Sequence, residues 1–216
     1  MPERKVLLYV LLAVAGVLAA ALLWRMLSRP DASLAGLSAE EVRIERLRRA
    51  GDVAALAAEA GSGREETAVL AVRALGRLGP GAIGPLAPAL KDPRERVRAS
   101  AAVAFGRVAT RERAAPLAEA LAKDPSARVR AAAATALHEM LAYNHMEALL
   151  GALNDDSRGV RQRAFRAVAE ITGVEVRYSP DASPADRLRA AEQMRRMWKR
   201  IAPIVREYHE SGPARR

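Results

Sequence analysis

A glycine-rich stretch, GPGAIG at residues 79–84, matches the G-x-G-x-x-G pattern in which backbone amides approach the phosphates of a nucleotide. That chemistry requires a strand before the first glycine and a helix after the last one, within a βαβ unit. The preceding residues, RALGRL, have the composition of a helix. We therefore predict that residues 79–84 form a turn between helices. Nucleotide binding would require a strand that leads into Gly79.

Other reactive residue types are few and scattered. The chain has no cysteine, and its three histidines are His138, His145 and His209. None of them belongs to a set of three or four residues spaced as metal ligands. The adjacent carboxylates Glu65-Glu66 and Asp155-Asp156 stand at expected helix starts, where negative charge interacts favourably with the helix dipole. The sequence therefore names no catalytic residue, metal ligand or cofactor site, and we expect no enzymatic activity.

One segment recurs along the chain, as KDPRERVRASAAVAFGRVA at 91–109, KDPSARVRAAAATALHEML at 123–141 and DDSRGVRQRAFRAVAEIT at 155–172. Aligning the copies gives four apolar rows, Val97/Val129/Val160, Ala101/Ala133/Ala164, Phe105/Leu137/Val168 and Val108/Met140/Ile171. Spacings of four, four and three residues mark one face of an α-helix. A shorter apolar helix precedes each copy. Such helical hairpins cannot bury their own apolar faces, so they must stack on one another.

The Asp-Pro pairs predict where the longer helices begin. Aspartate is a preferred cap residue, and proline is tolerated in the first turn, where no hydrogen-bond donor is missed. We expect Asp92 and Asp124 at the caps and Pro93 and Pro125 in the first turns.

The pattern D-P-x-x-x-V-R-x-x-A-A-x-A-L-G resembles HEAT repeats, specifically the bacterial repeats called phycobilisome-lyase-like. The resemblance covers residues 51–172 as four repeats. The first copy is degenerate, because Thr67 and Ala68 replace Val-Arg, and this is expected of a repeat that caps a stack. The resemblance implies an all-α fold, a right-handed α-solenoid of about four hairpins with capping helices.

In HEAT-like proteins the turn aspartate and the following arginine form a ladder of hydrogen bonds between repeats. The resemblance carries this structural role to Asp92, Asp124, Asp155, Arg98, Arg130 and Arg161. The alternative is that the three arginines form a basic stripe for phosphate or an acidic partner. Charges repeated at fixed offsets from a helix start favour the ladder.

The first thirty residues suggest a membrane anchor. Residues 6–24 contain no charge, and as a helix they would extend about 28 Å, close to the thickness of a bilayer's hydrocarbon core. Basic residues flank this stretch on both sides, so orientation stays open, and the short head favours a solenoid outside the cytoplasm. We expect a single-pass protein of the bacterial inner membrane. The alternative is a cleaved signal peptide ending at Ala19 to Ala21.

The last segment departs from the repeat. Leu188, Ala191, Met194, Trp198, Ile201 and Val205 recur at helical spacing, and arginines and lysines occupy the other faces. Pro203 should kink this helix or restart it near Ala202. The pattern I-T-G…Y-x-P-D-A…R…W resembles the terminal segment of many bacterial HEAT-repeat proteins, which implies a cap. A basic outer face is also compatible with contact to anionic lipid or to an acidic partner.

These features divide the chain into four parts. They are a transmembrane anchor at 1–27, a linker at 28–37, a repeat solenoid at 38–172 and a basic amphipathic capping helix with its tail at 173–216. Within the solenoid we expect a cap helix at 38–50, opened by a capping box from Ser38 to Glu41, and repeats at about 51–79, 80–109, 113–141 and 144–172.

The charge distribution bears on the partner. The formal net charge is +10, but residues 1–30 contribute +3 and residues 187–216 contribute +6, so the repeat body is close to neutral. That balance argues against a nucleic-acid-binding or glycosylase-like HEAT protein, which needs a basic groove and an aromatic cleft. A bilin lyase-like activity is implied only by the label of the repeat family.

We therefore expect a membrane-anchored scaffold that binds another protein, of unknown identity, through a HEAT-repeat surface. Side chains on the longer helices that belong neither to the core nor to the ladder would form this surface. The candidate partner surface consists of Ser100, Arg107, Thr135, Glu139, Arg163, Arg166 and Glu170.

Overall fold

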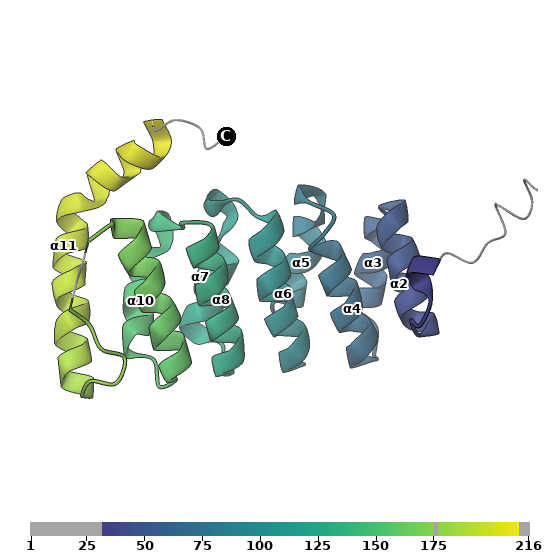
Figure 1. Ribbon diagram of the computed structural model, residues 1–216, viewed down its shortest axis with the longest axis horizontal. Coiled ribbons are helices and arrows are strands. Elements are labelled where there is room, and N and C mark those ends of the chain that lie inside the picture. The colour runs from purple at the N-terminus through teal and green to yellow at the C-terminus, as the bar shows by residue number, and fades with distance from the viewer. Residues whose placement is uncertain (1–31, 175–176, 212–216) are drawn as a thin grey trace, which may run out of the picture. The chain divides into compact units, whose positions relative to one another are not determined.

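A computed structural model describes residues 32–174 and 177–211, and these residues form helices and turns without any strand (Figure 1). The α-helices are α2 (Ala39–Ala50), α3 (Val53–Ala60), α4 (Glu65–Leu75), α5 (Ile83–Ala89), α6 (Glu95–Val108), α7 (Ala115–Lys123), α8 (Ala127–Glu139), α9 (Met146–Gly151), α10 (Arg158–Thr172) and α11 (Pro184–Ser211). Short 3-10 helices are η1 (Ala32–Leu34), η2 (Pro80–Ala82), η3 (Arg111–Arg113), η4 (Tyr143–His145) and η5 (Ala152–Asn154).

The chain divides into two compact units, residues 1–42 and 43–216. The described part of the first unit holds η1 and the start of α2. There Ser38 and Glu41 form the expected capping box, because the Glu41 carboxylate accepts from the Ser38 amide at 2.8 Å and Ser38 Oγ accepts from the Glu41 amide at 3.2 Å. These hydrogen bonds lower the pKa of Glu41.

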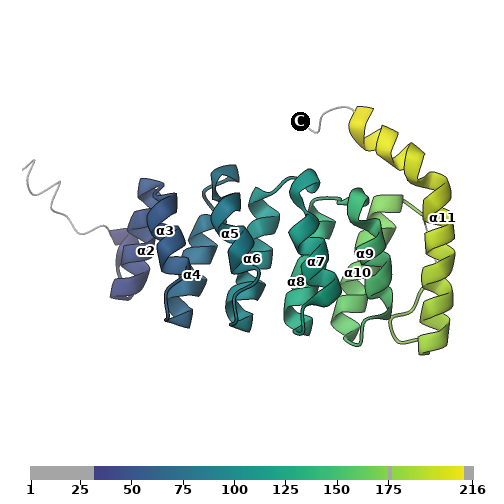
Figure 2. The same ribbon diagram turned by 180° about the vertical axis from the view of Figure 1, so that it is seen from behind.

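Four helical hairpins follow one another in the second unit: α3 with α4, α5 with α6, α7 with α8, and α9 with α10. The second helix of each hairpin, α4, α6, α8 or α10, stacks beside its successor in one layer (Figure 1). The first helices, α3, α5, α7 and α9, form the other layer (Figure 2). This arrangement confirms the expected all-helical repeat solenoid, and its right-handed sense stays a prediction.

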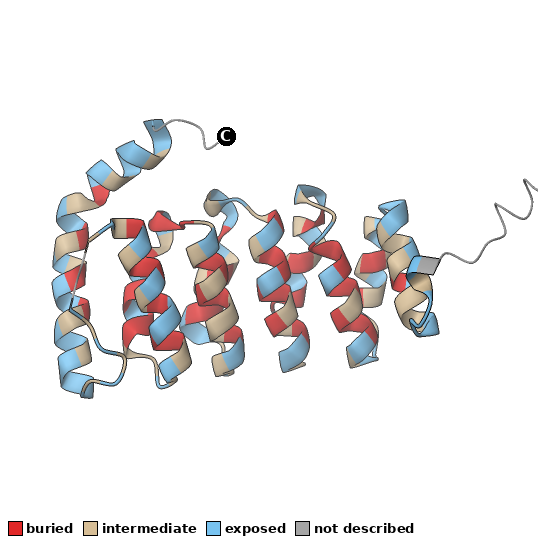
Figure 3. Ribbon diagram, viewed as in Figure 1, coloured by how far each residue is buried: buried red, intermediate tan, exposed pale blue. Residues whose placement is uncertain are grey.

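The core runs through both layers, where the helices face one another (Figure 3). The aligned rows lie there as expected: Val97, Val129 and Val160 are completely buried, and only Met140 among the twelve row residues is partly exposed. Alanine and glycine let the second helices approach closely. A Cβ atom on Gly106 would lie 2.6 Å from Cβ of Ala136 in the next hairpin.

Helices α6 and α8 begin two residues later than predicted, so Pro93 and Pro125 lie in the turn before each helix and not in its first turn. The residues that cap α6 and α8 are Arg94 and Ser126, so the assignment of Asp92 and Asp124 as caps is wrong. Each aspartate instead accepts, through Oδ1, a hydrogen bond from the amide two residues ahead, at 2.8 Å and 2.9 Å. This local bond forms a turn before the helix and leaves the second carboxylate oxygen available to another side chain.

The turn at residues 79–84 follows α4 rather than a strand. Gly79 has a positive φ of 84°, and Pro80 opens η2, which continues into α5. The strand that nucleotide binding would require before Gly79 is therefore replaced by a helix.

None of the helices within residues 32–174 and 177–211 is long and apolar enough to cross a membrane. The predicted anchor at residues 6–24 lies outside the described residues.

Helix α11 packs against the last hairpin through buried Met194, Trp198 and Ala202. Leu188, which was expected on the apolar face, is 51% exposed. The helix is continuous through Pro203 and bends in the half that contains this proline (Figures 1 and 2). Proline has no backbone N–H group to donate to the preceding turn, and this accounts for a bend at this place.

Candidate protein-binding surface

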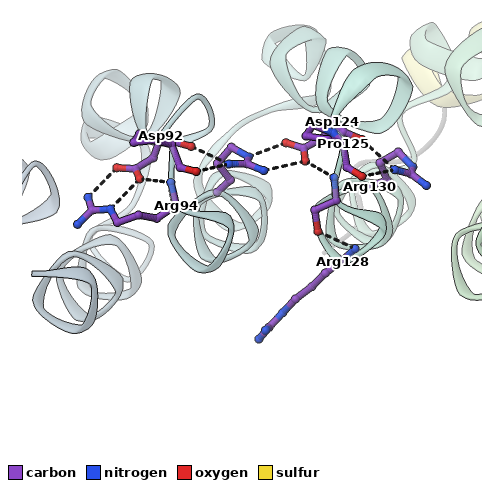
Figure 4. A network of polar contacts seen from close by, with 9 residues as sticks. Asp92, Arg94, Asp124, Pro125, Arg128 and Arg130 are labelled. Carbon is purple, nitrogen blue, oxygen red and sulfur yellow. Dashed lines mark hydrogen bonds and ion pairs between the residues drawn. The ribbon is translucent and has the colours of Figure 1, made fainter.

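Arginine and aspartate side chains join consecutive hairpins along one edge of the solenoid (Figure 4). Arg98 on α6 binds Asp124 of the following hairpin, with Nε 2.8 Å from Oδ2 and Nη2 3.2 Å from Oδ1. Arg130 on α8 binds Asp155 in the same way, at 2.6 Å and 2.8 Å. The Nη1 group of each arginine also donates to two carbonyl oxygens of the turn before its own helix.

Each arginine–aspartate pair, which we call a rung of the ladder, satisfies the hydrogen-bonding groups of both side chains. The Arg98 side chain is 13% exposed and that of Asp124 is 6% exposed, so a missing partner would leave a charge mostly buried. The hydrogen bond to the carboxylate raises the pKa of Arg98 and of Arg130. The two arginines are therefore occupied, and they offer no free charge to a ligand.

The ladder ends differently at its two ends. Arg161 has no following repeat, and its Nε donates instead to the carbonyl oxygen of Pro180 at 2.8 Å. The first hairpin has no arginine to reach Asp92, because Ala68 stands at that position. Arg94 takes its place: it binds both oxygens of Asp92 and donates through Nη1 to the Ser62 carbonyl at 2.8 Å. This bond to Arg94 lowers the pKa of Asp92.

A different set of side chains faces away from the first helices. We use the name second-helix surface for the outward side chains of α4, α6, α8 and α10, together with Arg77, which follows α4 by two residues. A groove of about 420 Å³ crosses its first three helices. The groove is lined by Arg73, Arg77, Ala99, Ser100, Val103, Ala104, Arg107, Arg128 and Ala132. We name it the arginine groove.

The lining of the arginine groove holds four arginines and no acidic residue. Within the described residues, none of these four guanidinium groups has a hydrogen bond or an ion pair. Figure 4 shows the Arg128 side chain extending away from the neighbouring ladder. The floor consists of small side chains, together with Val103, which is 43% exposed. The site therefore combines unpaired positive charge with a shallow apolar surface.

The structure places the predicted surface residues in two groups. Ser100 and Arg107 line the arginine groove. The others lie toward α10: Glu139 and Arg166 are exposed, Arg163 donates to the Gly159 carbonyl at 2.9 Å, and Thr135 Oγ1 donates to the Ala131 carbonyl at 3.1 Å. Glu170 is already engaged, because its Oε2 lies 2.6 Å from Nε2 of His138.

Sequence reasoning missed three of the four groove arginines, Arg73, Arg77 and Arg128. The first two lie in the degenerate first repeat, outside the three aligned copies. Placing Leu75 beside Phe105 would have put Gly76 over Gly106 and Arg77 over Arg107. Arg128 stands next to a core valine, and only the direction of its side chain assigns it to the groove.

The described residues contain no group of three or more His, Asp or Glu side chains that could hold a metal ion. A second cavity, of about 410 Å³, lies beside the turns before α6 and α8 and is lined by the ladder residues Asp92, Arg98 and Asp124. The side chains of these residues are bonded to other protein groups. The arginine groove is therefore the better candidate for ligand binding.

Comparison with known proteins identifies the repeat. A family model for HEAT repeats matches residues 53–138 and 114–196. A search of curated proteins gives no match. A chain from the complex of CpcE and CpcF of phycocyanin lyase from Nostoc sp. PCC7120 superposes with a TM-score of 0.50 at 20% identity, covering 71% of this chain and 90% of that chain.

A designed armadillo repeat protein in complex with the peptide (KR)4 gives a TM-score of 0.49 at 22% identity, covering 81% of this chain and 88% of that chain. At this level of identity, the similarity to the phycocyanin lyase chain shows a shared fold only. The HEAT-repeat model, in contrast, covers more than half of the sequence, and its matched residues include the hairpins and the ladder described above. The chain therefore belongs to the family of HEAT-repeat proteins.

Proposed function

We propose that this chain is a scaffold that binds another protein through the second-helix surface. The observation that carries the proposal is the arginine groove, which crosses three helices and whose charged groups serve neither the core nor the ladder. Unpaired side chains gathered over several repeats form an extended surface of the kind that solenoids use for binding. The phycocyanin lyase structure, which has a related fold, comes from a complex of two proteins and supports a protein partner by analogy.

The groove itself favours binding over catalysis. Its lining contains arginine, serine and apolar side chains, and it contains no histidine or carboxylate that could serve as a general base. A lyase-like activity would need such a group or a bound cofactor at another place. We therefore propose a non-enzymatic role.

Site-specific cross-linking tests this proposal. A photo-reactive amino acid is placed at Val103, in the arginine groove, and at Ala122, which is exposed on α7 in the other layer. We expect a discrete protein cross-link at Val103 that is absent at Ala122, with the partner identified by mass spectrometry. Equal cross-linking at the two positions, or none at Val103, would count against the second-helix surface.

We also propose that residues 6–24 anchor the chain in a membrane, with the solenoid outside the cytoplasm. The proposal rests on the uncharged length of this stretch and on its basic flanks. Alkaline carbonate extraction should leave the full chain in the membrane fraction, and protease added to spheroplasts should remove a C-terminal tag. Release into the soluble fraction would instead support a cleaved signal peptide.

The exposed basic side chains of α11, among them Lys199 and Arg200, support a further proposal of contact with anionic lipid. The protein should then sediment with vesicles of phosphatidylglycerol and not with vesicles of phosphatidylcholine. The double variant Lys199→Gln/Arg200→Gln should reduce that sedimentation.

A further inference from the structure

We propose that the arginine groove binds an acidic, extended segment of the partner protein. This inference rests on the proposed function, and it adds the chemistry of the segment that is bound. Two observations support it, the unbalanced charge of the groove and the small residues of its floor, and the usual spacing of packed helices adds an expected pattern.

The charge of the groove is unbalanced at short range. Arg73 lies in the last turn of α4 and Arg77 lies two residues beyond the helix, and these two like charges repel each other where they line the same groove. Arg107 and Arg128 approach the same groove from α6 and α8. A carboxylate can bind an arginine through two parallel hydrogen bonds, so an acidic segment would satisfy donors that have no partner within the described chain.

The floor of the groove selects for a slender segment. Ala99 and Ala104 are buried, Ala132 and Ser100 are partly exposed, and Val103 offers the one larger apolar side chain. Small side chains at these positions let a peptide backbone lie close to the helices. Residues between the acidic ones should therefore be small or moderately apolar, so that they contact Val103 without steric conflict.

Helix spacing sets the expected pattern of acidic residues. Packed helices have axes about 8–10 Å apart, and a segment in the extended polyproline II conformation advances about 3.1 Å per residue with about three residues per turn. Neighbouring second helices are therefore separated by about three residues of such a segment, and every third side chain lies on the same face of it. An acidic residue at every third position would face arginines from α4, α6 and α8 in turn.

A protein segment fits the surface better than a nucleic acid does. No aromatic side chain lines the groove, so unpaired bases would find no stacking platform. Beyond the groove, exposed Glu139 and Glu170 interrupt the positive surface on α8 and α10. A phosphate backbone that continued along the solenoid would meet these carboxylates.

The proposal is tested by fluorescence anisotropy with the full chain solubilised in detergent. The probe is a fluorescein-labelled peptide of repeated Glu-Ala-Ser triplets, and the comparison probes are a Lys-Ala-Ser peptide and an oligo-deoxythymidine. We expect binding of the Glu peptide alone, with affinity that falls as sodium chloride is raised from about 0.05 M to about 0.5 M.

The variant Arg77→Ala/Arg107→Ala/Arg128→Ala should weaken binding by about tenfold or more, since each exposed pair is worth up to about fivefold. The matched control is Arg46→Ala/Arg113→Ala/Arg206→Ala, which removes the same net charge from exposed positions outside the groove. The control should change the affinity by less than about twofold. Circular dichroism melting confirms that both variants remain folded.

Each contrary outcome overturns the inference. No binding of the Glu peptide, equal losses in the two triple variants, or tighter binding of the oligonucleotide would each show that the groove does not select an acidic segment. Cross-linking at Val103 separates this result from the proposed function. A cross-link that persists in the Arg77/Arg107/Arg128 variant would reject the acidic segment and keep the protein-binding surface, whereas no cross-link in the unmodified protein would reject that surface.

Discussion

Arg98 reaches from one hairpin to Asp124 of the next, and its guanidinium binds both carboxylate oxygens while it also holds the turn before its own helix. One side chain thereby fixes two relationships, the start of α6 and its position relative to the following hairpin. The Asp124 carboxylate does the same from its side, since Oδ1 also accepts from the Ser126 amide. Arg130 and Asp155 repeat the arrangement, so that the geometry passes from one repeat to the next.

Removing a rung should destabilise the solenoid. Arg98→Ala leaves the carboxylate of Asp124 mostly buried without its partner, and we expect a loss of about 2–4 kcal/mol in the free energy of unfolding. Arg128→Ala is the control, because Arg128 is exposed and its side chain is unpaired, and it should change stability by less than about 0.5 kcal/mol. Chemical denaturation measures both, and similar values for the two variants would contradict a stabilising ladder.

The repeat and its core could be predicted because a solenoid presents the same packing problem in each copy. The same residue type fills the equivalent buried position in three copies, at Val97, Val129 and Val160. The ends of the stack could not be predicted in this way. At each end the neighbouring segment is not a regular repeat, and a different bond replaces the rung. Arg94 donates to the Ser62 carbonyl at one end, and Arg161 donates to the Pro180 carbonyl at the other.

The candidate site was predictable only in part, for a related reason. Core positions are restricted by packing, whereas surface positions vary from copy to copy. Arg73, Arg77, Arg107 and Arg128 come from three repeats and from different offsets, and only the stacking of the helices gathers them. The contact between His138 and Glu170 was unpredictable for the same reason, because the position of His138 is occupied by Gly106 in the preceding repeat.

Gly106→Ala should destabilise the protein although alanine favours helix formation. The new methyl group would lie 2.6 Å from Cβ of Ala136, and relieving that contact should cost about 1–3 kcal/mol. The matched control is Gly84→Ala in α5, where nothing lies within 4 Å of the added atom. The control should gain about 0.5–1 kcal/mol from helix propensity alone. Opposite signs in the two thermal shifts are the expected result, and stabilisation of both variants would show that α6 and α8 can separate readily.

Tyr178→Phe should loosen the C-terminal end of the stack. The Tyr178 hydroxyl donates to the Leu153 carbonyl at 2.5 Å, and its ring stacks on Phe165, a contact that the variant keeps. Loss of the hydrogen bond should cost about 1 kcal/mol. Because repeats depend mainly on their neighbours, hydrogen exchange should rise in α9 and α10 before it rises in α4. The control is Tyr208→Phe, at a position that is 70% exposed, and it should change neither the stability nor the hydrogen exchange. A uniform rise of hydrogen exchange along the chain in Tyr178→Phe would contradict this end-specific role.

His145 should make stability depend on pH near neutrality. Burial lowers the pKa of His145, and its Nε2 has no hydrogen-bond partner within the described residues. The unfolded chain therefore binds a proton on this side chain at a pH where the folded protein does not. The free energy of unfolding should rise with pH through the region just below about 6.5, the ordinary pKa of histidine, and His145→Gln should flatten that rise.

Asp92→Asn provides the contrast, because the bond to Arg94 lowers the pKa of Asp92 in the folded protein. The ionised folded state contributes stability above the ordinary aspartate pKa of about 3.9, and this contribution is lost as the pH falls through the lowered folded value. Asp92→Asn should therefore reduce the acid-dependent loss below about pH 4 and leave the slope near neutrality intact. Urea unfolding of the unmodified protein, His145→Gln and Asp92→Asn gives the free energy of unfolding of each. Measuring it both below about pH 4 and near neutrality separates the effect of Asp92 from that of His145. An unchanged slope near neutrality in His145→Gln would show that another group is responsible for it.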